Sequence, residues 1–340
     1  MSTASATETL RERQLLTAAR DGDEDAFRQL VETRRGELHV HCYRMLGSLH
    51  DAEDALQEAL LRAWRGIGRF EGRSSLRSWL YTIATNVCLD AIGRRPKRVL
   101  PLDYGPASDP HAAPGEPIVE SVWLEPYPDE MLGLEDGFAG PAASYERREG
   151  VELAFIAALQ HLPATQRAVL IMREVLGFSA KEAAATLETT LASVNSALQR
   201  ARATLATVQT EPSPRASVDP DQRELLARYV DAFERYDVSG LVTLLHDDAV
   251  QSMPPYAMWI RGSANIGRWL LGAGIGCRGS RLLPASANGC AAFGQYRVDP
   301  EGGHKPWALQ VIEVSGERIS GFHSFLDGNL FPAFGLPQTL

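Results

Sequence analysis

The chain has few cysteines and no long apolar run, and these absences exclude several classes of protein. Its four cysteines, Cys42, Cys88, Cys277 and Cys290, lie far apart without a C-x-x-C pair, so neither a zinc site nor a disulfide framework is predicted. No stretch of about 18 apolar residues is present, so no membrane span is predicted. The N-terminus lacks the basic start and apolar core of a signal peptide, so we expect a cytoplasmic protein with reduced thiols.

An overall excess of basic residues, which is typical of nucleic-acid-binding proteins, is also missing. The formal net charge is −9, but the charge is distributed unevenly. Residues 101–150 contain 11 acidic and 2 basic residues, so this segment alone equals the whole imbalance. Residues 62–98 contain nine basic and two acidic residues, a local charge of +7. A basic surface suited to nucleic acid is therefore predicted there.

The pattern along the chain indicates several domains, as its length of 340 residues allows. We expect a helical unit at 8–98, an acidic Pro/Gly-rich linker at 99–142, a second helical unit at 143–208, a Pro/Ser linker at 209–220 and an α+β domain at 221–335. The run WLEPYP in the first linker is too aromatic for a featureless tether. This run indicates a docked segment.

The first unit ends in an amphipathic basic helix. Helix patterns lie at about 10–20, 23–47, 51–66 and 75–93. The last one has an apolar stripe on one side and hydrogen-bonding residues on the other, and four basic residues follow it. Such a helix can lie on a nucleic-acid backbone and present a few side chains to bases. A generic amphipathic helix with a solvated basic end fits the same pattern.

The second unit contains a predicted helix-turn-helix. Ser179 and Glu182 form a capping-box pattern that starts a short helix, a turn follows at 188–190, and a longer helix reaches about residue 207. The apolar stripe of the longer helix comprises Val194, Leu198, Ala201 and Leu205. Its predicted outward positions are Ser193, Asn195, Ser196, Ala197, Gln199, Arg200 and Arg202. Asn, Gln and Arg can read bases or hold phosphate there, although a structural helical hairpin is the alternative.

Three motifs in order resemble the extracytoplasmic-function (ECF) group of sigma-70-type bacterial transcription initiation factors. They are DAEDALQEALLRAW at 51–64, LRSWLYTIATNVCLDAIGRRPKR at 76–98, and the helix-turn-helix stretch at 162–205. The resemblance covers roughly residues 10–208. It implies a sigma factor that directs RNA polymerase core to specific promoters and has no chemistry of its own.

The resemblance also implies which residues bind. The −10-like element would contact Arg73, Ser74, Ser75, Arg77, Asn86, Asp90, Arg94, Arg95, Lys97 and Arg98, with a base flipped into a pocket beside the loop at 72–75. The −35-like element would contact Ser193, Asn195, Ser196, Gln199, Arg200 and Arg202. The polymerase largest-subunit clamp would contact Asp54, Gln57, Leu61 and Trp64, and the polymerase flap is a further expected contact. Asp90, Asn195, Ala197 and Gln199 depart from the family pattern, which leaves the promoter sequence open.

The last segment begins with a helical pattern, DQRELLARYVDAFERYD, and continues with strand-like runs at 249–255, 291–298, 307–314 and 318–326. Helices followed by antiparallel strands predict an α+β domain. The pattern resembles the SnoaL-like cone fold. Its candidate ligand pocket comprises Tyr256, Trp259 and His323, with His246, Asp247, Asp248 and Arg261 as further candidates for its lining.

The function we favour is a sigma factor modulated in cis by this domain, with a small molecule as its candidate ligand. The alternative is a small-molecule-binding or cyclase-like enzyme domain fused to a DNA-binding regulator; a plain helix-turn-helix repressor is a third hypothesis. No catalytic residue, cofactor or metal is predicted. The carboxylates at 51–58 are expected at a solvated helix start, where they complement the helix dipole. Whether an anti-sigma factor exists stays open.

Overall fold

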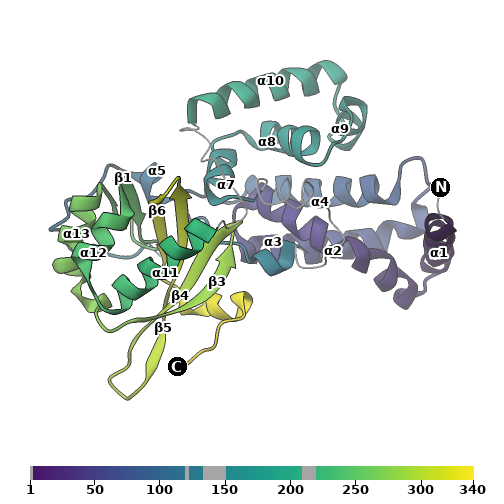
Figure 1. The fold of residues 1–340 in the computed structure, drawn as a ribbon. Coiled ribbons are helices and arrows are strands. Elements are labelled where there is room, and N and C mark those ends of the chain that lie inside the picture. The colour runs from purple at the N-terminus through teal and green to yellow at the C-terminus, as the bar shows by residue number, and fades with distance from the viewer. Residues whose placement is uncertain (1–2, 119–121, 133–150, 209–219) are drawn as a thin grey trace. The chain divides into compact units, whose positions relative to one another are not determined.

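The computed structural model describes residues 3–118, 122–132, 151–208 and 220–340. The chain divides into two compact units. Unit 1 comprises residues 1–95 and 158–208, and unit 2 comprises residues 96–157 and 209–340 (Figure 1). The predicted segment at 209–219 and the region 133–150 lie outside the described residues.

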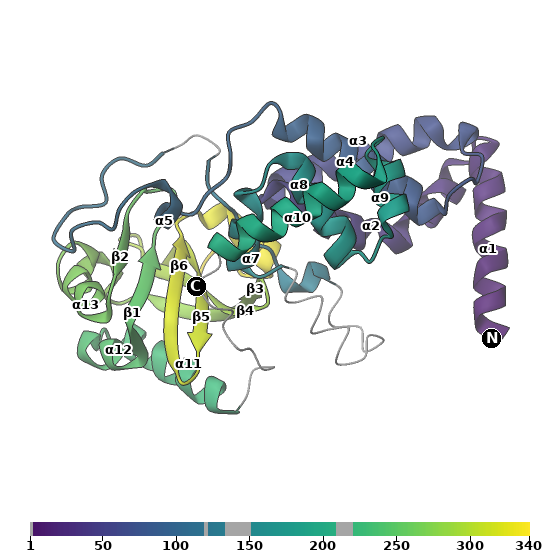
Figure 2. The same ribbon diagram turned by 90° about the horizontal axis from the view of Figure 1, so that it is seen from above.

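The first part of unit 1 consists of the four predicted helices. They are α1 (Thr3–Arg20), α2 (Glu24–Leu46), α3 (Leu49–Gly66) and α4 (Leu76–Ile92). Local caps fix where they begin: the side chains of Asp23, Ser48 and Ser75 each accept a hydrogen bond from a backbone N–H three residues on. Helices α2, α3 and α4 pack on one another (Figure 2). Their core includes Leu38, Tyr43, Met45, Leu56 and Ala84, all nearly inaccessible to solvent.

The second part of unit 1 is a helix-turn-helix, as predicted. It contains α8 (Ala164–Leu170), a π-helical turn (Ile171–Val175), α9 (Ala180–Thr186) and α10 (Leu191–Val208), and α7 (Leu153–Gln160) precedes it. The capping box is present. Ser179 N–H donates to Glu182 Oε2 at 2.8 Å, and Glu182 N–H donates to Ser179 Oγ at 3.2 Å. Glu188 adopts a left-handed φ of 48° in the turn before α10.

The two parts of unit 1 pack against each other through α4 and α9. The hydroxyls of Thr82 and Thr186 lie 3.2 Å apart, and the ring of Tyr81 meets the ring of Phe178 edge-on with centroids 5.6 Å apart. Arg77 lies over both rings. In this arrangement the helix-turn-helix covers part of α4.

Arg167 on α8 also connects the helix-turn-helix with the first part of unit 1, through hydrogen bonds in the protein interior. Its side chain is 4% exposed and donates to the carbonyls of Met45, Gln160 and Leu162. Burial lowers the pKa of Arg167 to about 10, so the guanidinium is still charged at neutral pH.

We expect Arg167→Met to lower the free energy of unfolding by about 3 kcal/mol, because three buried carbonyls would lose a charged donor. Chemical denaturation of the full chain measures this. Arg200→Met, at an exposed position of α10, should change the free energy of unfolding by less than about 0.5 kcal/mol. Equal stabilities of the two variants would contradict the proposed role of Arg167.

Unit 2 is built on one six-stranded sheet, which confirms the α+β prediction. The strands are β1 (Leu245–Ser252), β2 (Trp259–Arg261), β3 (Arg281–Ala287), β4 (Cys290–Val298), β5 (His304–Ser315) and β6 (Arg318–Phe325), in the order β2-β1-β6-β5-β4-β3. The helices are α11 (Pro220–Glu234), α12 (Val238–Leu244) and α13 (Ser263–Leu271). Rings from α11, β4 and β6 cluster in the core, where Tyr229 contacts Phe233, Phe293 and Phe322.

Three details of the sheet differ from the sequence-based expectation, one of them the short strand β2, which was not predicted. The strands are not all antiparallel, because β1 pairs with β6 in parallel. Strand β3 was not predicted, since Pro284 interrupts its pattern. Proline is tolerated here because β3 is the last strand in the order of the sheet, with β4 as its neighbouring strand.

The described part of the acidic segment after residue 95 belongs to unit 2 and packs along its sheet domain at 220–340. It contains α5 (Pro101–Tyr104) and a 3-10 turn (Asp129–Leu132). Trp259 Nε1 donates to the Gly105 carbonyl at 2.7 Å, and Ile118 N–H donates to the Pro255 carbonyl at 2.9 Å. Further along, Pro128 forms a β-bridge with Ala287. The segment predicted as a linker therefore includes a docked stretch that contains the run WLEPYP.

Candidate nucleic-acid interface

The loop before α4 and one position on α4 form the candidate site for the −10-like element. Gly72 adopts a left-handed φ of 71°, and the exposed residues Arg73, Ser74 and Ser75 follow it. Asn86 on α4 is half-buried and follows Ser75 by 11 residues, about three helical turns. Small polar side chains in the loop leave room for an extruded base, and the amide of Asn86 on the same helix offers hydrogen-bonding groups.

Two of the candidate residues on α4 are bonded within unit 1. Arg77 Nε donates to Glu37 Oε2 at 3.2 Å and its guanidinium lies 4.9 Å from the centre of the Tyr81 ring. Asp90 accepts from Arg62 Nη1 at 3.2 Å. Arg77 can therefore reach DNA only after its contacts are broken.

The basic run after α4 differs in exposure from residue to residue. Arg94, Arg95 and Lys97 are exposed. Arg95 pairs with Asp51 of α3, whose carboxylate is largely buried. The expectation that Asp51 lies at a solvated helix start is corrected here: Asp51 pairs with the chain's own Arg95.

Arg98 lies inside unit 2 and does not fit the predicted contact with DNA. Its side chain is 7% exposed and donates to the Trp123 carbonyl at 2.7 Å, with Glu125 at 3.5 Å. Burial lowers the pKa of Arg98, and its hydrogen bonds hold the docked segment. We therefore leave Arg98 out of the candidate DNA surface.

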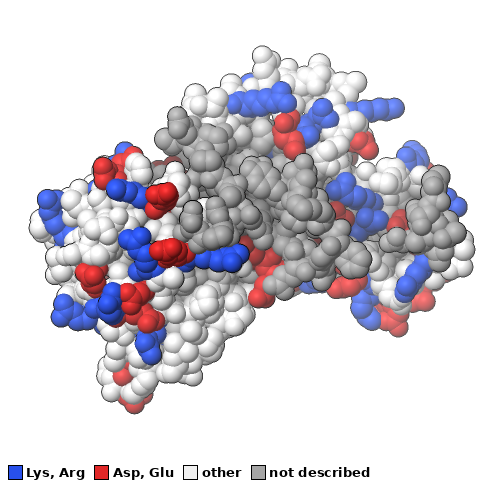
Figure 3. Space-filling model, viewed as in Figure 1, with Lys and Arg blue, Asp and Glu red and all other residues white. Residues whose placement is uncertain are grey.

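The outer face of α10 is the candidate site for the −35-like element. All six predicted residues are exposed: Ser193, Asn195, Ser196, Gln199, Arg200 and Arg202. Arg202 pairs with Glu174 at 2.6 Å, and basic side chains lie on the surface around this helix (Figure 3). Ala197 is buried, which corrects its predicted outward position. It follows Val194 by three residues and precedes Ala201 by four, so it belongs to the same buried stripe.

One face of α3 is the candidate polymerase-binding surface. Asp54, Gln57 and Leu61 are exposed at helical spacing on it, and the side chain of Leu61 is 50% exposed. Trp64 is half-buried, with its ring 5.2 Å from that of Phe27. The surface thus presents an apolar residue beside polar ones.

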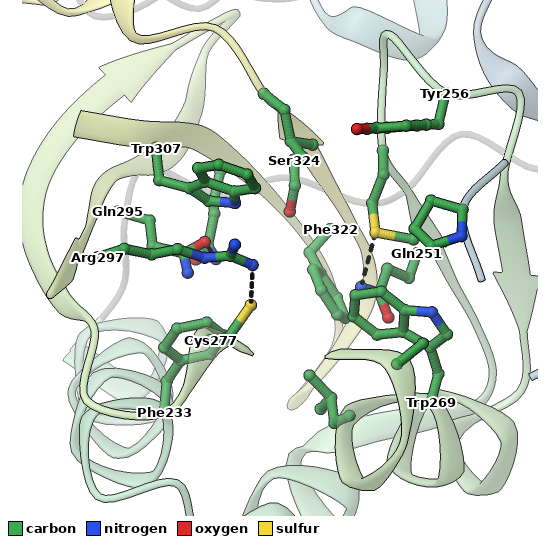
Figure 4. Close-up of a pocket in the computed structure, with 16 residues that line it drawn as sticks. Phe233, Gln251, Tyr256, Trp269, Cys277, Gln295, Arg297, Trp307, Phe322 and Ser324 are labelled. Atoms are coloured by element: carbon green, nitrogen blue, oxygen red, sulfur yellow. Dashed lines mark hydrogen bonds between the residues drawn. The ribbon is translucent and has the colours of Figure 1, made fainter. Parts of the chain in front are cut away.

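A cavity of about 160 Å³ lies in unit 2 (Figure 4). Tyr256 lines it, but Trp259 and His323 do not. His323 faces the other side of β6 from Phe322, because neighbouring residues of a strand alternate, and it bonds Ser252 Oγ at 2.7 Å. The other four candidates, His246, Asp247, Asp248 and Arg261, do not line the cavity either.

The cavity is lined instead by residues that sequence reasoning missed, among them Gln251, Arg297 and Trp307. Gln295 and Arg297 share a face of β4 with the core residue Phe293. Polar residues at alternate positions of a strand, in line with a core aromatic residue, were the signal for them in the sequence.

Neither a metal site nor a membrane span is found in the part of the chain that the structure describes. No cluster of three or more His, Cys, Asp or Glu side chains could hold a metal ion there. Within the same residues, no helix is long and apolar enough to cross a bilayer.

Comparisons with known proteins agree with the two parts of unit 1. The Sigma-70 region 2 family matches residues 30–98, and the Sigma-70, region 4 family matches residues 152–205. The ECF RNA polymerase sigma factor SigG of Mycobacterium tuberculosis is 44% identical over 321 residues, which covers 92% of this chain and 85% of SigG. The ECF RNA polymerase sigma-E factor of Escherichia coli K12 is 29% identical and covers 57% of this chain and 92% of its own length.

A solved structure shows the same fold over most of the chain. The Mycobacterium tuberculosis extracytoplasmic function sigma factor SigJ aligns with a TM-score of 0.56 at 21% identity, over 90% of this chain and 98% of SigJ. The alignment extends through unit 2 and agrees with the predicted SnoaL-like cone. Given the two sigma regions in order and the similarity to SigG over nearly its whole length, the chain belongs to the ECF sigma factors of the sigma-70 family, with a SnoaL-like α+β domain after the sigma regions.

Proposed function

We propose that this sigma factor uses three surfaces of unit 1 to start transcription. The outer face of α3 binds RNA polymerase core, the loop at 72–75 and Asn86 bind the −10-like element, and the outer face of α10 binds the −35-like element. The order of the two sigma regions supports this proposal, as does the exposure of all six candidate residues on α10. A sigma factor supplies promoter specificity to the polymerase and needs no chemistry of its own.

Asn86 carries the proposal for base capture. Its side chain lies off the buried stripe formed by Leu80, Ala84 and Val87 on α4, so an amide here serves no packing role in the core. A base extruded toward it would gain edge hydrogen bonds that offset the few kcal/mol of unstacking.

We expect Asn86→Ala to weaken open-complex formation by about 1 to 3 kcal/mol, with the loss confined to one base position. Permanganate footprinting on the native promoter, repeated with each base of the −10-like element changed, measures this. Core binding should not change. Asn265→Ala, at a half-buried position of α13 in unit 2 whose side chain bonds Arg261 and Arg268, is the control. Unchanged open-complex formation by Asn86→Ala would remove Asn86 from the site.

We also propose that unit 2 modulates transcription in cis by holding the segment that joins the two sigma regions. In sequence, this segment starts directly after the basic end of α4 and leads to α7. Asn288 supports the proposal most strongly. It is fully buried, its Oδ1 accepts from Tyr127 N–H at 2.8 Å, and its Nδ2 donates to the Val151 carbonyl at 2.6 Å. One side chain of the SnoaL-like domain thus forms hydrogen bonds with the connecting segment at two positions.

A further inference from the structure

The cavity of unit 2 has the size of a small aromatic ring. Its volume is about 160 Å³, and an engineered apolar cavity of about 150 Å³ in another protein binds benzene. Aromatic side chains from several elements line it, among them Phe233 from α11, Trp269 from α13 and Trp307 from β5. Trp307 has no partner on β4 because β5 is bulged there: Tyr296 pairs with Pro306 and Gln295 pairs with Ala308. A bulge can redirect a side chain toward a site.

The charge of the cavity has one sign. Among the lining residues that the structure describes are the basic residue Arg297 and no Asp, Glu, Lys or His. Its guanidinium lies 3.6 Å from the centre of the Trp307 ring and donates to Cys277 Sγ at 3.3 Å. Its Nε is buried and has no hydrogen-bond partner among the described residues. A cation held in a largely apolar space without a carboxylate favours an anionic ligand.

The three glutamine side chains that line the cavity differ in how many of their amide atoms have hydrogen-bond partners. Gln310 donates to Gln295 Oε1 at 3.0 Å and accepts from Tyr229 at 2.8 Å, and Gln295 donates to Ser280 at 2.9 Å. Gln251 is 2% exposed, yet its Oε1 has no partner among the described residues. A buried acceptor without a donor is costly, so the ligand should carry a hydroxyl or amine that donates to Gln251.

Arg297 and Gln251 approach the cavity from opposite sides. Figure 4 shows Arg297 and Trp307 on one side, Gln251 on the other and Phe322 between them. A ring in this space can therefore present an acid to Arg297 and a donor to Gln251 at once. No carboxylate or imidazole among the described lining residues could act as a general base.

We propose that this cavity is a receptor site for a small aromatic carboxylate with a hydroxyl or amine donor, and that it binds this ligand without converting it. The carboxylate pairs with Arg297, the ring packs between aromatic side chains, and the donor bonds Gln251 Oε1. Pro114 of the docked segment lines the same cavity. A bound ligand therefore touches the segment that joins the sigma regions; this last step rests on the proposed regulation in cis.

Calorimetric titration of the full chain with matched probes tests the binding itself, whatever the effect on transcription. The probes are 3- and 4-hydroxybenzoate, benzoate and the two hydroxybenzamides. We expect the better hydroxybenzoate to bind roughly 10- to 100-fold more tightly than its amide, which lacks the charge, and about tenfold more tightly than benzoate, which lacks the donor. No binding of any probe at millimolar concentration, or equal binding of acid and amide, would overturn the proposal. Incubation with the bound probe should return it unchanged, and any product would overturn the assignment as a receptor.

Substitutions of Arg297 and Gln251 test which residue binds the carboxylate and which accepts from the donor. Arg297→Met should make the hydroxybenzoate and its amide bind equally, and Gln251→Leu should make hydroxybenzoate and benzoate bind equally. Arg318→Met is the control, because Arg318 of β6 is half-exposed and does not line the cavity. It should leave all affinities unchanged. Thermal unfolding checks that each variant is folded; if Arg297→Met is not, Arg297→Lys keeps the charge and should keep the preference for the acid. Loss of that preference in a folded Arg297→Lys, or its persistence in a folded Arg297→Met, counts against the site.

Discussion

Leu61→Asp is expected to abolish stable binding of RNA polymerase core, with an affinity loss of at least about 100-fold. Leu61 is the exposed apolar residue of the candidate face on α3, beside Asp54 and Gln57. An apolar side chain at the centre of an interface loses its contacts when it becomes a carboxylate, and the new charge is buried without a partner. Fluorescence anisotropy of the labelled chain with purified core measures the affinity.

The variant should fold normally, because half of the Leu61 side chain is already in solvent. Leu271→Asp is the matched control: this leucine of α13 is 64% exposed and belongs to unit 2. Transcription from the native promoter should fall with core affinity for Leu61→Asp and stay unchanged for the control. If core binds the two variants with equal affinity, α3 does not form the polymerase contact through this face.

Asn288→Ala is expected to release the docked segment from the SnoaL-like domain and to change the strength of transcription. Asn288 has a left-handed φ of 56°, a conformation that Asn adopts more readily than Ala. The substitution also removes both side-chain hydrogen bonds to the connecting segment. We expect the free energy that holds the segment on the domain to fall by about 2 to 4 kcal/mol. Hydrogen exchange of the amides at 122–128 should accelerate by at least tenfold, which corresponds to about 1.4 kcal/mol.

Two further variants separate the causes. Asn288→Gly retains the backbone conformation and loses the side chain, so it should also release the segment. Asn265→Ala should leave exchange and transcription unchanged. Truncation after Thr210 removes most of unit 2 and should shift transcription in the same direction as Asn288→Ala, without altering which promoter bases are preferred. If the truncated chain, Asn288→Ala and the full chain transcribe identically with and without hydroxybenzoate, the domain does not regulate in cis.

Much of unit 1 could be predicted because its signals are local in the sequence. The helices follow from apolar residues at helical spacing and from caps such as Ser75 and Ser179, whose partners are three residues away. The helix-turn-helix and the exposure of six candidate residues on α10 follow from the same periodicity. Ala197 was misplaced because a small residue at the edge of an apolar stripe fits either side of a helix.

Whether a charged side chain is exposed or paired within the protein depended on contacts between residues far apart in the chain. Arg98 belongs by sequence to a basic run, yet it is buried against Trp123, and Asp51 is paired with Arg95. Neither contact leaves a periodic signal, because each partner comes from a different element.

The cavity illustrates the same limit more strongly. Gln251, Arg297 and Trp307 come from β1, β4 and β5, which β6 and the bulge in β5 bring around one space. The run of strands predicted an α+β domain, but not the parallel pairing of β1 with β6 that places Gln251 beside Phe322. Local periodicity tells which side of an element faces inward. Strand order and register, which depend on the packing of the whole domain, determine which inward side chains meet.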